Sequence, residues 1–160
     1  MEPSIDQGRR DALRRGGGVS LLTLLAATGW LPSTANAQAW NKSAFETHAL
    51  DETVKALGGS TSAQSKDIVF VATPDIAENG SVVPIGITSG IPKTESIAIL
   101  VEKNPNMLAA VFDIPPGTEP AVTTRIKMGQ SSNVYALVKA DGKFYVASKE
   151  IKVTLGGCGG

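Results

Sequence analysis

The chain has 160 residues, a length that suits one domain with a single hydrophobic core. Its 15 basic and 15 acidic residues balance, so the composition gives no excess of positive charge for binding nucleic acid. One cysteine and one histidine exclude an internal disulfide framework and any metal site that needs several Cys or His ligands.

The first 37 residues have the pattern of an export signal. A basic start is followed by an uncharged stretch over residues 16–31 and by small residues that end at Ala37, a typical cleavage site. The stretch is shorter than the ~20 apolar residues that span a membrane, which argues against an anchor. The pair Arg9-Arg10 is similar to the twin-arginine consensus of bacterial signals. We therefore expect residues 1–37 to be cleaved and the protein to reach the periplasm already folded, without membrane insertion; a Sec-type signal with extra arginines is the alternative.

A short helical segment follows the predicted signal. Ser43 and Glu46 have the spacing of a capping box, with Ser43 as the N-cap. Apolar residues then recur at helical spacing, namely at Leu50, Val54 and Leu57. Gly58 and Gly59 provide a C-cap, so the sequence predicts one helix between Ser43 and Gly58. His48 falls within this helix, where we interpret it as a structural residue and not as a ligand.

The chain after Gly59 has the period-two pattern and the β-branched residues of strands. Seven strands are expected, at Ile68–Thr73, Val82–Thr88, Ser96–Val101, Leu108–Asp113, Ala121–Met128, Asn133–Ala140 and Lys143–Leu155. Turn residues separate them, and Asp141-Gly142 is the strongest hairpin signal. The pattern predicts a mainly β domain over residues 38–155, an antiparallel β-sandwich of about seven strands with an N-terminal helix. It does not distinguish an Ig-like sandwich from another Greek key.

The last five residues, Gly156-Gly157-Cys158-Gly159-Gly160, cannot form a packed strand, because glycine has no side chain to bury. We therefore expect residues 156–160 to form a mobile arm, called the carrier arm below, with Cys158 exposed at its centre. Three residues from Leu155 give the thiol a reach of roughly 10 Å. No base or cation stands beside Cys158 in the sequence to activate it as a nucleophile. The motif is thus typical of a substrate presented to enzymes, and we expect no catalytic residues in this chain.

This terminal motif, with Val153-Thr154-Leu155 before it, resembles the SoxY family, the sulfur-carrier subunits of the bacterial Sox system for thiosulfate oxidation. The segments Pro74–Gly80 and Val83–Ile85 are also similar to the first inter-strand turn of that family. The resemblance implies an Ig-like β-sandwich and a sulfur or thiosulfonate adduct held covalently on Cys158. It implies no tightly bound cofactor and no metal ligands in the chain itself.

The same resemblance implies the partners. A SoxZ-type subunit would form a heterodimer with the chain, and the haem enzyme SoxAX would conjugate thiosulfate to Cys158. SoxB, a di-manganese hydrolase, would release sulfate, and a SoxCD-type sulfane dehydrogenase would act where it is present. No nucleic-acid partner is expected.

Three other functions remain open at this point. An exported thiol-redox protein would also use an exposed cysteine, although such proteins normally have a second one. A ubiquitin-like sulfur carrier would use its C-terminal Gly-Gly as a thiocarboxylate. A structural or adhesive β-sandwich would explain the strands but not the terminal thiol.

Overall fold

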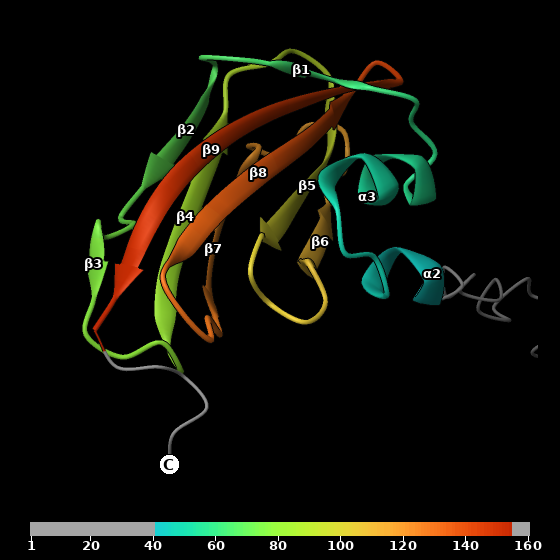
Figure 1. Cartoon of the computed structure of the whole chain (residues 1–160). Coiled ribbons are helices and arrows are strands. Elements are labelled where there is room, and N and C mark those ends of the chain that lie inside the picture. The colour runs from blue at the N-terminus through green and yellow to red at the C-terminus, as the bar shows by residue number, and fades with distance from the viewer. Residues whose placement is uncertain (1–40, 155–160) are drawn as a thin grey trace, which may run out of the picture. The chain divides into compact units, whose positions relative to one another are not determined.

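A computed structural model describes residues 41–154, and both the predicted signal peptide (1–37) and the carrier arm (156–160) lie outside the described residues. The described chain contains two short helices followed by strands (Figure 1). Their bounds are α2 Lys42–Phe45, α3 Leu50–Ala56, β1 Ser62–Gln64, β2 Ile68–Val71, β3 Ile76–Ala77, β4 Val83–Ser89, β5 Thr94–Val101, β6 Leu108–Asp113, β7 Ala121–Ile126, β8 Ser132–Ala140 and β9 Lys143–Val153.

The strands form two sheets, which confirms the predicted mainly β sandwich. The large sheet has the order β1-β9-β8-β5-β6, with β3 pairing with the far end of β9, and the small sheet has the order β2-β4-β7. All seven predicted strands are present and pair with one another antiparallel. The sequence did not indicate β1 and β3, which both pair parallel to β9, with Ser62 opposite Phe144 and Ile76 opposite Lys152. These strands have two or three residues, too few for a recognisable pattern.

The inner strand β5 of the large sheet is buried on both faces over residues 97–101. Alternate residues of β5 show this, since Ile97 and Ile99 belong to the core between the two sheets, whereas Ala98 and Leu100 belong to a second core under the helices. All four are at most 2% exposed. A strand covered on both faces has an almost continuous apolar sequence. The sandwich therefore has two apolar layers, one between the sheets and one between the large sheet and α2 and α3.

The predicted single helix is wrong, because the chain breaks it between Phe45 and Leu50. The N-cap of α2 is Asn41, whose side chain accepts from the Ala44 N–H, and Glu46 is the C-cap residue. Thr47 explains the break. Its carbonyl accepts the N–H of Met107 at 2.9 Å, and its buried hydroxyl bonds the Thr53 hydroxyl at 2.6 Å. The bond from Met107, a distant residue, takes the carbonyl that would otherwise accept an N–H of the next helical turn and continue the helix.

The predicted C-cap at the end of α3 is confirmed. Gly58 has a positive φ of 90°, and its N–H donates to the Lys55 carbonyl. The next N–H, of Gly59, donates to the Val54 carbonyl at 2.8 Å. This pair of bonds is a Schellman motif, which needs a left-handed residue that glycine adopts without strain. It turns the chain sharply towards β1.

The predicted hairpin at Asp141-Gly142 is also confirmed and sets the direction of β9. Both residues have positive φ, 50° and 72°, as a type I′ turn requires. From this turn β9 runs antiparallel to β8 along the whole of β8, from Lys143 opposite Ala140 to Ile151 opposite Ser132. Figure 1 shows β9 beginning beside β1 and ending beside β3.

Gly86 in β4 marks a close approach of two backbones. A Cβ atom at this position would lie 2.4 Å from the carbonyl oxygen of Val71 on β2. We expect Gly86→Ala to reduce the free energy of unfolding by about 1–3 kcal/mol, because the strands must move apart to admit the methyl group. The measurement is a urea unfolding curve. Gly129→Ala is the matched control, since nothing lies within 4 Å of its Cβ position; equal losses for both variants would contradict the prediction.

Candidate functional site

Residues 152–154, the last two residues of β9 and the one that follows it, lead to the carrier arm and are called the arm root here. The N–H of Thr154 donates to the Ala77 carbonyl at 3.0 Å. On the opposite side, the N–H of Val153 donates to the Ser131 hydroxyl at 2.9 Å. The arm root is thus held from both edges of the strand, by β3 and by the loop that precedes β8.

A lysine ties the segment around β3 to β9. Lys149 lies on β9, and its ammonium donates to the Thr73 carbonyl at 2.5 Å and lies 3.1 Å from a carboxylate oxygen of Asp75. Its side chain is 25% exposed, whereas the Asp75 side chain is 87% exposed, so the ion pair itself adds little to stability. The backbone adds the N–H of Lys152, which donates to the Asp75 carbonyl at 2.9 Å. Together these bonds fix where the chain leaves the sandwich.

The predicted site residue Cys158 and the glycines of the carrier arm lie outside the described residues. Covalent geometry still limits the position of Cys158, because four residue steps separate it from Thr154. At about 3.6 Å per step, the Cα atom of Cys158 lies no more than about 14 Å from that of Thr154. The side chain extends the reach of the sulfur beyond this Cα distance, so any group that reacts with the thiol must still come close to the arm root.

The exposed large apolar side chains of the described residues all belong to the segment of the chain that precedes β4. The large hydrophobic residues that are exposed in the described chain are Val69, Val71, Ile76 and Val82. Ile76, 58% exposed, lies beside the arm root through its pairing with Lys152. Sequence reasoning placed Ile76 in a turn and missed this feature; its apolar character within a polar turn was the available signal.

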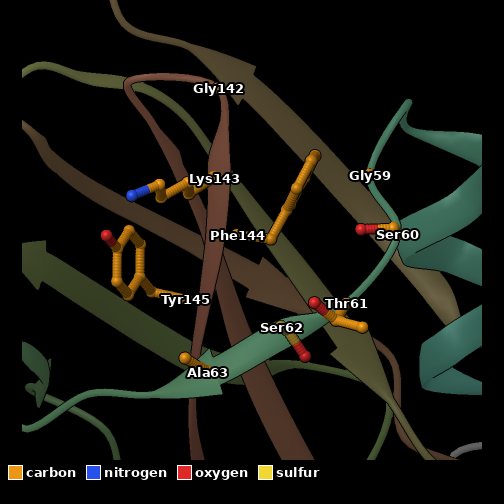
Figure 2. Close-up of a pocket in the computed structure, with 9 residues that line it drawn as sticks. All are labelled: Gly59, Ser60, Thr61, Ser62, Ala63, Gly142, Lys143, Phe144 and Tyr145. Atoms are coloured by element: carbon orange, nitrogen blue, oxygen red, sulfur yellow. The ribbon is translucent and has the colours of Figure 1, made fainter.

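A pocket of about 280 Å³ lies at the other end of β9, between β1 and the β8–β9 hairpin. Figure 2 shows Phe144 pointing from β9 towards Gly59 and Ser60, with Lys143 and Tyr145 on the other side of the strand. Ten residue steps along β9 separate Lys143 from Val153, a distance of about 33 Å in an extended strand. The carrier arm cannot reach this pocket, which therefore belongs to a different part of the surface.

Ionisable groups with shifted pKa values lie away from the arm root. Lys139, 3.1 Å from Glu95, and the Gly142 N–H hold the pKa of the Glu95 carboxyl below its ordinary value, at the hairpin end of β9. Burial, followed by the charge of Glu102, raises the pKa of Tyr135 in the middle of β8. Neither group forms an acid–base pair beside the arm root.

His48 lies in the turn between α2 and α3, not within a helix, and is exposed. Its Nδ1 is 2.7 Å from the Pro105 carbonyl, so it joins the helical segment to the loop before β6. Over residues 41–154 there is no group of three or more His, Cys, Asp or Glu side chains that could hold a metal ion. In the same range, no helix has the length and apolar character to cross a membrane.

Comparison with known proteins relates the chain to sulfur carriers. A family model described as "Sulfur oxidation protein SoxY" matches residues 54–158, a range that ends at Cys158. The structure of the sulfur carrier protein SoxY from Chlorobium limicola f thiosulfatophilum is 36% identical and has a TM-score of 0.60; the match covers 66% of this chain and 96% of that one. The two-sheet fold with few helices is thus similar to that of an Ig-like sandwich.

Other solved structures are more distant. The endo-beta-1,4-mannanase from Thermotoga petrophila is 14% identical, with a TM-score of 0.42 and coverage of 65% of this chain and 23% of that one. The human F-spondin reeler domain is 7% identical, with a TM-score of 0.39 and coverage of 57% and 93%. No curated protein matches the chain.

Proposed function

Because this chain belongs to the SoxY family of sulfur oxidation proteins, we propose that it carries sulfur intermediates covalently on Cys158 and presents them to oxidising and hydrolysing enzymes. The observation that supports this most directly is the position of the cysteine. It follows a strand whose end is bonded on both edges, and only four residue steps separate it from that fixed end. A tether of this kind joins a rigid body to a reactive group that can enter another protein.

The proposed chemistry divides between this chain and its partners. The Cys158 thiolate forms a bond to the sulfane sulfur of thiosulfate, giving an S-thiosulfonate; this is a two-electron oxidation that releases the thiol proton. The haem enzyme SoxAX accepts those electrons. Water then attacks the sulfone sulfur and cleaves its bond to the sulfane sulfur, with SoxB as the hydrolase, releasing sulfate and a proton and leaving the sulfane sulfur on Cys158 as a persulfide. The carrier supplies the thiol and the reach, and it has no catalytic residue of its own in this proposal.

The remaining proposed partners are a SoxZ-type subunit, as the other half of a heterodimer, and a SoxCD-type sulfane dehydrogenase. Membership of the family supports partners within the sulfur-oxidation system in general. We place the complex in the periplasm, because residues 1–37 resemble a twin-arginine signal.

The experiment that tests the proposed function is an intact-mass measurement of the mature protein, purified from thiosulfate-grown cells without reductant. We expect species heavier than the unmodified chain by sulfur or thiosulfonate groups, which thiol reductants remove. Since the chain has one cysteine, every such adduct reports on Cys158. A mass that always equals that of the unmodified chain, or that of a glutathione adduct only, would contradict a carrier role.

Export is tested separately. We expect Arg9→Lys combined with Arg10→Lys to leave the uncleaved precursor in the cytoplasm, because the twin-arginine pathway recognises that pair. Cell fractionation followed by immunoblotting of precursor and mature forms provides the measurement. Arg14→Lys combined with Arg15→Lys is the matched control, with equal conservation of charge in the same basic segment. Normal export of the first variant, stopped only when Sec is inhibited, would reverse the assignment.

A further inference from the structure

One side of the sandwich has two unpaired edge strands. β6 ends the large sheet and β7 ends the small sheet, and no other strand of the described chain pairs with their outer edges. A groove of about 550 Å³ opens between them, called the β6–β7 groove here. Its lining residues are Asn104, Pro105, Asn106, Leu108, Ala109, Ala110, Thr124, Arg125, Ile126 and Lys127.

The hydrogen bonds of the β4–β7 ladder show which backbone groups of β7 are free. The Ser89 N–H donates to the Pro120 carbonyl at 2.9 Å, so this pair of residues is one of the hydrogen-bonded pairs of the ladder. In an antiparallel pair the bonded positions recur every second residue, so Thr124, opposite Ile85, also bonds towards β4. The N–H and C=O groups of Thr123 and Arg125 therefore point away from β4, along the open edge.

The groove has an apolar floor, a cationic rim and a fixed end. Ile126, only 6% exposed and part of the core between the two sheets, forms the floor. Arg125 and Lys127 are exposed and form no ion pair within the described chain, and none of the lining residues is acidic. The Asn104 side chain closes one end, since it donates to the Lys127 carbonyl at 2.8 Å and accepts the Gly129 N–H at 3.2 Å.

We propose that the β6–β7 groove binds an extended, acidic segment of a partner protein, which adds to β7 as an edge strand. The free backbone groups of Thr123 and Arg125 would pair with the segment, as in other cases of strand addition. Its carboxylates would lie against Arg125 and Lys127, and its alternate apolar residues would face the floor. A second copy of this chain fits less well, because residues 121–128 contain two cations and no acid, so pairing β7 with β7 supplies no carboxylate. The proposal is independent of the chemistry at Cys158.

The probe is a short blocked peptide in which Glu and Val alternate, titrated into the full mature chain and followed by NMR of the backbone amides. We expect the amide signals of Thr123 and Arg125 to shift and to be protected from exchange. A peptide with Lys in place of Glu should bind at least about tenfold more weakly, because like charges then meet at the rim. Equal binding of both peptides, or shifts centred elsewhere, would overturn the proposal. Amide shifts at β7 that grow with protein concentration alone would assign the edge to a second copy instead.

Variants separate the charge and backbone contributions. Arg125→Glu combined with Lys127→Glu should reverse the preference between the two peptides, whereas Lys55→Glu combined with Lys66→Glu, at exposed positions outside the groove lining, should not. Thr123→Pro removes only an outward N–H and should abolish the protection while the chain stays folded. A folded Thr123→Pro variant that still binds the acidic peptide would exclude strand addition. The intact-mass measurement is unaffected by any of these results.

Discussion

Cys158→Ser is expected to abolish sulfur loading completely while leaving the fold unchanged. The serine hydroxyl cannot form the bond to sulfane sulfur, and no second cysteine in the chain can take its place. The ladder of β9 ends at Val153, and the flanking glycines have no side chains that pack around the substituted residue. Intact mass after incubation with thiosulfate and the loading enzyme measures the first effect, and thermal unfolding measures the second.

After incubation, the wild type should therefore have the mass of the chain plus the adduct, whereas Cys158→Ser should have the mass of the unmodified chain. The two proteins should have the same melting temperature. The proposed complex with a SoxZ-type subunit should also persist, as judged by size-exclusion chromatography. A melting temperature lowered by many degrees, or loss of that complex, would show that Cys158 has a structural role. An adduct retained by Cys158→Ser would place the sulfur elsewhere on the chain.

Gly157→Leu is expected to slow enzyme-dependent loading or release by about a hundredfold or more. If the enzymes enclose the carrier arm in narrow channels, a leucine beside the thiol must fit where the wild type has no side chain. A clash that costs about 2.7 kcal/mol in the transition state corresponds to a hundredfold loss of rate. Gly156→Ala should have a smaller effect, since it only restricts the backbone.

The measurement for Gly157→Leu is a pair of rates. Alkylation of Cys158 by a small reagent needs no channel and should be nearly unchanged, whereas the enzyme-dependent rate falls. Gly129→Leu is the matched control, because it adds the same side chain to the body of the protein at a position with open space. Equal effects of Gly157→Leu on both rates would mean that the thiol itself is perturbed, and no effect on either would mean that no partner encloses the arm.

Local patterns in the sequence were sufficient to predict the seven longer strands. Their alternation and turn residues act over a few positions, and the Asp141-Gly142 hairpin needs nothing beyond its own two residues and their flanking strands. The break between α2 and α3 was not predictable in this way. It depends on the Thr47 carbonyl accepting an N–H from Met107, sixty positions later in the chain, and no local pattern records such a contact.

The candidate site also has one part that local sequence predicts and another that depends on contacts between distant residues. Cys158 and its glycines were predicted from the terminal sequence alone, because glycine has no side chain to bury, and they lie outside the described residues. The arm root was not, since β3 has only two residues and exists because β9 passes beside it. The Ser131 bond to Val153 and the Lys149 contacts with Thr73 and Asp75 likewise join distant segments. Sequence reasoning predicted which residue would be reactive, but not the contacts that hold the arm root.

The pairing of β9 also has a mechanical consequence. In the proposed function, a partner that draws the carrier arm into itself would pull on β9 along the strand axis. β8 pairs with β9 from Lys143 to Ile151, while β1 and β3 hold its other edge near the two ends. A pull along this axis loads the ladder bonds in shear, all at once, instead of opening them one by one from a free end. The sandwich would therefore resist a pull on its C-terminal end without β9 separating from its neighbours. The binding energy of a partner would then position the thiol and would not unfold the strand.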